Sequence, residues 1–118
     1  MPATPKPYQV TRASDVDVVR FIQPKIPQPA LESLQKELAK RIEEGARKME
    51  VNLEPVAFVD SFGIGVIAAT ARAIAQKGGA LKLCGVNDRV RMSLTITRLD
   101  KSLDIQPDEA TALRSFGG

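Results

Sequence analysis

The fold is decided by one stretch, residues 56–79, which reads VAFVDSFGIGVIAATARAIAQKGG. An extended apolar run ends sharply at Asp60, two glycines follow close behind, and a strongly apolar segment continues to a glycine pair at positions 78 and 79. The apolar residues occupy more than one side of a helical projection, so we predict a buried helix from about Ile64 to Gln76. A buried helix directly after an extended apolar run is typical of domains in which helices pack on a sheet.

Ahead of this stretch, the chain predicts two strands, a loop, a helix and a third strand. Residues 16–22 are rich in β-branched side chains, and residues 8–11 offer a shorter strand to pair with them. The prolines within residues 23–29 exclude a helix or a central strand there. A helix follows, and residues 49–53 form a short strand. The predicted buried face of the helix recurs at steps of three and four: Leu31, Leu34, Leu38 and Ile42.

Behind the stretch, strands and helices continue to alternate. Residues 80–84 predict a strand, residues 87–97 a helix and residues 103–105 a short strand. A last helix begins near Pro107, with Ala110 and Leu113 as its expected buried residues. The resulting order predicts a single α/β domain, with a mixed, mostly parallel sheet of about four or five strands and four helices.

Composition limits the classes of function. The chain has 118 residues, 43% of them hydrophobic, with a net charge of +3 carried by scattered basic residues. Four Phe, one Tyr and no Trp leave little for stacking on bases, so nucleic acid is not an expected partner. No apolar run is long enough to predict a membrane span. We expect a flexible N-terminal arm over residues 1–7 and a domain over residues 8–118.

The chain contains no histidine and a single cysteine, Cys84. Catalytic arrangements built on histidine are therefore excluded, and a zinc site would have to rely on one thiolate and carboxylates. Cys84 ends a predicted strand and is expected to be a small buried hydrophobe in a reducing, cytoplasmic setting. The glycines at 63 and 65 complete neither a dinucleotide fingerprint nor a P-loop. We therefore predict no catalytic residue, no metal and no cofactor.

The turn at residues 60–65 is the candidate site. Either Asp60 or Ser61 can cap the helix that follows, since both residue types are favoured there. A hydroxyl at an exposed helix start is also an accessible phosphate acceptor, because the helix dipole favours an anion at that end. Capping and phosphorylation are compatible, and both readings stay open.

Residues 49–105 resemble a STAS domain, the fold of anti-sigma factor antagonists and of sulfate-transporter tails. The specific part is Asp60-Ser61-x-Gly63-Ile64-Gly65, preceded by Phe58-Val59. Further matching pieces are Val51-Asn52-Leu53, the stretch from Lys77 to Val86, and the tail from Ile96 to Ile105.

The resemblance implies a regulator that works through protein contacts. Its partner would be an anti-sigma factor that is also a serine kinase, which phosphorylates Ser61 and is thereby released; a serine phosphatase is a further candidate partner. The expected protein is cytoplasmic and monomeric or dimeric. The resemblance implies a partner-binding surface made of Asp60, Ser61, Phe62, Gly63, Ile64 and Gly65.

Two departures from the family pattern bear on the partner. Phe62 stands where a second small hydroxyl residue is common, a version that resembles the scaffold-type STAS proteins of stressosomes. Prolines between Pro24 and Pro29 replace a glycine-and-aspartate turn. The alternatives of a stressosome scaffold and of an accessory subunit of a transporter therefore stay open.

Overall fold

The computed structural model describes residues 6–117, and within them five strands and four α-helices follow in the predicted order. Most of the expected arm lies outside these residues, but Pro7 is buried and its carbonyl accepts a hydrogen bond from the Ile22 amide at 2.9 Å. The elements are β1 (Tyr8–Ala13), β2 (Val16–Phe21), α1 (Gln28–Glu43), β3 (Lys48–Asn52), α2 (Ser61–Gln76), β4 (Ala80–Cys84), α3 (Asp88–Ile96), a short 3-10 helix η1 (Leu99–Lys101), β5 (Asp104–Gln106) and α4 (Glu109–Gly117).

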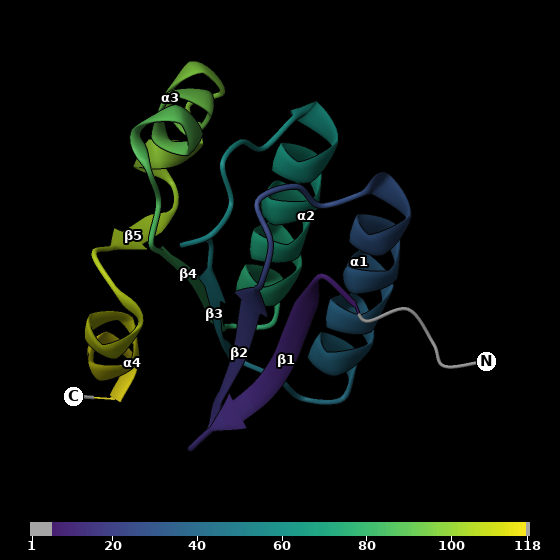
Figure 1. Cartoon of the computed structure of the whole chain (residues 1–118). Helices are drawn as coiled ribbons and strands as arrows, with labels where there is room; N and C mark the ends of the chain where they lie inside the picture. The colour runs from purple at the N-terminus through teal and green to yellow at the C-terminus, as the bar shows by residue number, and fades with distance from the viewer. Residues whose placement is uncertain (1–5, 118) are drawn as a thin grey trace.

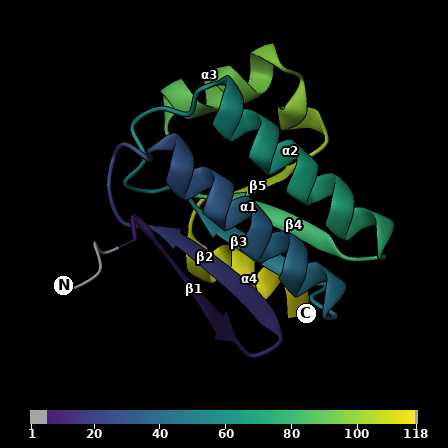
Figure 2. The same ribbon diagram turned by 90° about the vertical axis from the view of Figure 1, so that its right-hand side faces the viewer.

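The sheet is mixed and mostly parallel, as predicted. The strands lie in the order β1-β2-β3-β4-β5; β1 runs antiparallel to β2, and each later pair is parallel. Parallel neighbours need a crossover, which α1, α2 and α3 provide. Helices α1 and α2 lie side by side on one face of the sheet, whereas α4 covers the other (Figures 1 and 2). The ends of the parallel strands and the starts of α1 and α2 therefore share one edge.

The main core lies between the sheet and the helix pair α1 and α2. All four residues of the predicted α1 stripe are buried there, together with Val19, Val51 and Leu83 from three neighbouring strands. Alternate strand residues point to the opposite face, where α4 packs. No helix within residues 6–117 is both long and apolar enough to span a membrane.

Two local predictions differ from the structure. Helix α2 begins at Ser61, three residues before the predicted start near Ile64. The apolar run before it, residues 56–59, belongs to no helix or strand, and its Ala57 amide donates to the Pro24 carbonyl at 3.1 Å. Helix α4 buries Ala112 rather than Ala110. Glu109 pairs with Arg20 of the sheet, and residues three and four positions further along share its face, so Ala112 turns inward and Ala110 outward.

Gly79 allows the turn after α2 to pass close to the backbone before β3. A Cβ at this position would lie 2.8 Å from the Arg47 Cα. We therefore expect Gly79→Ala to lower the free energy of unfolding by about 1–3 kcal/mol, measured by urea denaturation. Gly65→Ala is the matched control: it lies in a helix with no atom within 4 Å of the added Cβ, and should raise that free energy by about 0.5–1 kcal/mol. Equal stability of the two variants would contradict the close approach.

Candidate functional site

The loop of residues 53–60 joins β3 to α2 at the edge where the parallel strands end. Its first amide, from Leu53, donates to the Cys84 carbonyl at 2.9 Å, which ties the loop to β4. The Val56 amide donates back to the Leu53 carbonyl at 2.9 Å, and the Val56 side chain is buried. Sites in open α/β sheets are usually built at this edge.

Asp60 is the capping residue of α2. Its Oδ1 accepts a hydrogen bond from the Gly63 amide at 2.9 Å, and its carbonyl accepts one from the Ile64 amide at the same distance. Of the two capping residues that the sequence left open, the structure therefore selects Asp60. Ser61 is the first residue of the helix; it is exposed, and its hydroxyl makes no hydrogen bond to any residue within 6–117.

The other residues of the predicted partner surface differ in exposure. Gly65 is exposed, Phe62 is partly buried against the core, and Gly63 and Ile64 are buried. Gly63 is needed for packing, because a Cβ there would lie 2.6 Å from Val59 Cγ1. Contact with a partner stays a prediction for all six residues. The side chains that reach the surface fully are those of Asp60 and Ser61.

Neighbouring segments hold this loop in place, a feature that sequence reasoning missed. The Ala57 amide is bonded to Pro24, in the loop between β2 and α1. Asn87 caps α3 by accepting from the Val90 amide, and its Nδ2 donates to the Val56 carbonyl at 2.9 Å. The Arg89 guanidinium lies 5.3 Å from the centre of the Phe58 ring. Phe58, half exposed, thus links the loop to α3.

A cavity of about 550 Å³ lies beneath this loop and the β2–α1 loop, between α1, α2 and the sheet. Buried aliphatic side chains such as Leu34, Leu38 and Leu81 form its depth. Exposed residues of the two loops and Arg89 surround its mouth. Periodicity had indicated which side chains point inward, but not whether they fill the space between the helices.

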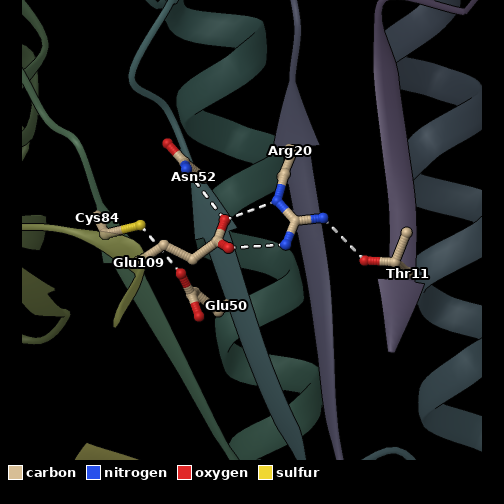
Figure 3. Close-up of polar contacts among 6 residues, drawn as sticks. All are labelled: Thr11, Arg20, Glu50, Asn52, Cys84 and Glu109. Atoms are coloured by element: carbon tan, nitrogen blue, oxygen red, sulfur yellow. Dashed lines mark hydrogen bonds and ion pairs between the residues drawn. The ribbon is translucent and has the colours of Figure 1, made fainter. Parts of the chain in front are cut away.

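On the other face, polar side chains of α4 and of four strands, β1 to β4, form a cluster (Figure 3). Arg20 donates two hydrogen bonds to the Glu109 carboxylate, at 2.8 and 2.7 Å. Asn52 Nδ2 donates to Glu109 at 3.2 Å, and Arg20 also donates to the Thr11 hydroxyl at 3.0 Å. The hydrogen bond from Arg20 lowers the pKa of Glu109, so this carboxyl is ionised in the pair.

Glu50 and Cys84 form the buried end of the same cluster. Glu50 is 0% exposed; the Cys84 thiol donates to its Oε1 at 3.1 Å, while Oε2 has no hydrogen-bond partner among the described residues. Burial raises the pKa of Glu50, and burial together with the neighbouring carboxyl raises the pKa of Cys84 far above that of a free thiol. A protonated, fully buried thiol is a poor nucleophile, so Cys84 offers no reactive group on this face.

Comparison with known proteins gives a consistent result. Residues 8–112 match the family model described as the STAS domain. The chain is 33% identical over 92 residues to an anti-sigma-B factor antagonist of Staphylococcus aureus, covering 78% of this chain and 76% of the relative.

Two solved structures share the fold. An anti-sigma-factor antagonist (STAS) domain protein from Planctomyces limnophilus has a TM-score of 0.83 at 22% identity, covering 94% of this chain and 98% of that one. The phosphorylated form of SpoIIAA, a cell fate determinant of Bacillus, has a TM-score of 0.76 at 20% identity, covering 92% and 98% of the two chains.

The buried carboxyl of Glu50 should make stability depend on pH. Because burial raises its pKa in the folded state, its contribution is complete below the unfolded pKa, about 4.3, and is lost as pH rises to the folded pKa. The free energy of unfolding of Glu50→Gln should therefore rise relative to that of the wild type as pH increases from 4 to 7. The gain is about 1.4 kcal/mol for each unit by which the pKa is raised. Urea unfolding across this range measures it.

Glu109→Gln is the control with the opposite sign. The pKa of Glu109 is lowered, so its pairing with Arg20 stabilises the fold above the unfolded pKa and is lost as pH falls. This variant should become less stable relative to wild type as pH rises. A pH-independent difference between Glu50→Gln and wild type would contradict the raised pKa of the buried Glu50 carboxyl.

Proposed function

The chain belongs to the STAS domain family, and we propose that it acts within it as an anti-sigma factor antagonist. In this proposal the chain binds an anti-sigma factor that is also a serine kinase, and phosphorylation of Ser61 by that kinase releases the complex. The role is one of binding rather than catalysis, and it places the protein in the cytoplasm with its partner. The relative from Staphylococcus aureus bears the corresponding name.

The observation that carries this proposal is the position of the Ser61 hydroxyl. It lies at the exposed first residue of a 16-residue helix. The neighbouring Asp60 caps this helix, so the Ser61 side chain is not needed for capping. The hydroxyl is therefore accessible to a kinase without loss of an internal hydrogen bond. A phosphate placed there also meets the positive end of the helix dipole.

The surroundings of Ser61 favour release of a partner over unfolding of the domain. Three neighbouring segments hold the loop before Ser61 through backbone and Asn87 hydrogen bonds, none of which uses the serine side chain. Phosphorylation adds a charge of about −1.5 to −2 beside the Asp60 carboxylate. In solvent this charge is screened, but under a docked partner it would be desolvated beside a like charge, which is costly.

Exposed apolar side chains next to this loop extend the proposed docking face onto α3. Met92 and Ile96 are 64% and 75% exposed and lie one turn apart on the helix. Arg89, one turn before Met92, contacts the half-exposed Phe58 of the loop, so the α3 stripe begins beside the site. Figures 1 and 2 show α3 at the same end of the domain as the start of α2. Large exposed apolar side chains are typical anchors at protein interfaces.

Binding to the kinase tests this proposal. The partner is captured from lysate of the source organism with Ser61→Ala and identified by mass spectrometry; its affinity is then measured by calorimetry. We expect Ser61→Ala to bind like the unphosphorylated wild type and to stay bound when ATP is added. Ser61→Asp should bind at least about tenfold more weakly, a loss of about 1.4 kcal/mol.

Ser14→Asp is the matched control. Ser14 is exposed in the β1–β2 turn, at the opposite edge of the sheet, and it has a positive φ that aspartate tolerates. This variant adds the same charge and should bind like wild type. Equal affinity of Ser61→Asp and Ser61→Ala would refute the switch.

A further inference from the structure

We propose that the cavity beneath the two loops binds a single-chain amphiphile with an anionic head, of the fatty-acid class. The cavity lies under the backbone that carries Ser61, and its mouth shares Phe58 and Arg89 with the docking face described above, but its binding of a ligand does not rest on phosphorylation of Ser61. Its ligand would enter between the β2–α1 and β3–α2 loops, with the apolar tail innermost.

The space matches a tail of this kind. Its volume of about 550 Å³ falls within the range of about 300–1,000 Å³ that small-molecule pockets occupy. Along α1 the lining runs from Leu31 to Leu38, about 10 Å of helix. Helix α2 forms the opposite wall, and Leu81 of the sheet contributes to the floor. The cavity therefore follows the groove between two helices that lie side by side (Figure 2).

The depth of the cavity offers almost no hydrogen-bonding groups. Among the lining residues of its interior, the polar side chain is that of Thr70, and its hydroxyl already donates to the Val66 carbonyl at 2.8 Å. A nucleotide or a sugar would leave its own polar groups unpaired there, which is costly. An aliphatic chain has no hydrogen bonds to water that it would lose on entering the cavity, and its apolar surface is removed from water.

Positively charged side chains at the mouth of the cavity favour a ligand with an anionic head group. Lys25 and Arg89 line it, and neither forms an ion pair with a residue within 6–117. The acidic residue of the lining, Asp60, is engaged by the Gly63 amide. The Arg89 guanidinium lies 5.3 Å from the centre of the Phe58 ring and donates no hydrogen bond within residues 6–117, so its N–H groups are available to an anion. Two cations against one capped carboxylate favour an anionic head over a neutral or cationic one.

The mouth is also preformed. Pro24 and Pro27 stiffen the β2–α1 loop, and the hydrogen bond from Ala57 to Pro24 fastens it to the β3–α2 loop. The bond from Asn87 to Val56 fixes the second loop from the side of α3. A ligand would have little backbone to order on binding.

Titration of the isolated, unphosphorylated full chain with dodecanoate, below its micelle concentration, tests the site. Calorimetry should show saturable binding of one dodecanoate per chain. Butanoate, which has the head without the tail, should not bind, and dodecan-1-ol, which has the tail without the charge, should bind more weakly. Backbone amide signals should shift at Lys25, Ala57 and Phe58. No kinase is present, so this result is separate from that of the switch.

Variants at the mouth of the cavity distinguish specific binding in the cavity from nonspecific binding of the amphiphile to apolar surface. Lys25→Glu and Arg89→Glu should each weaken dodecanoate binding about five- to tenfold while sparing dodecan-1-ol. Lys36→Glu is the matched control, because Lys36 is exposed on α1 but lies outside the cavity lining. Val66→Phe, which adds volume inside the cavity, should abolish binding and keep a cooperative thermal transition. If Val66→Phe does not fold, the charge variants decide.

Other results would overturn the proposal. Non-saturating binding, or shifts confined to Met92 and Ile96, would assign the amphiphile to the exposed stripe of α3. Equal binding by Lys25→Glu, Arg89→Glu and wild type would remove the role of the cations. A dimer in sedimentation that dissociates as dodecanoate is added would assign the cavity to a second copy of the chain.

Discussion

The hydrogen bond from the Gly63 amide to the Asp60 carboxylate is the interaction on which the site depends. It caps α2 through Asp60, the residue before Ser61, and so leaves the serine hydroxyl at the surface without a hydrogen bond to any residue within 6–117. The amide donor at the same turn belongs to a glycine because a Cβ at position 63 would collide with the Val59 side chain. Cap, glycine and exposed serine form one unit, which holds the Ser61 hydroxyl at the exposed start of α2.

Hydrogen bonds with other parts of the domain hold this unit in place. The loop before it is bonded to β4 through Leu53, to the β2–α1 loop through Ala57 and to α3 through Asn87. On the far face, the paired Arg20 and Glu109 fix α4 to the sheet. The two faces differ in kind: one is apolar with unfilled space beside the loop, and the other is polar and closely bonded. In the proposed switch, a charge added at Ser61 would therefore act on a partner docked against the loop rather than on the loop itself, which these hydrogen bonds hold in place.

Most of the fold could be predicted from the sequence, because periodicity reports local structure directly. The stripe from Leu31 to Ile42, the apolar α2 and the alternation of elements gave the α/β order and the mixed sheet. The site was predicted only in part: motif and helix start pointed to Ser61, but two capping residues were open. What was missed depends on contacts between distant segments, such as Asn87 with Val56 and Arg20 with Glu109, whose partners a single sequence does not pair. The cavity was missed because the spacing of apolar residues shows which side chains point inward, but not how completely they fill the space between the elements.

Mass spectrometry of the Ser61 peptide can decide whether phosphorylation of Ser61 controls partner binding. The protein is isolated from its source organism, separated into free and partner-bound fractions, and digested. We expect a phosphate on Ser61 in the free fraction and unmodified Ser61 in the bound fraction. Equal occupancy in the two fractions, or phosphate on another residue alone, would contradict it.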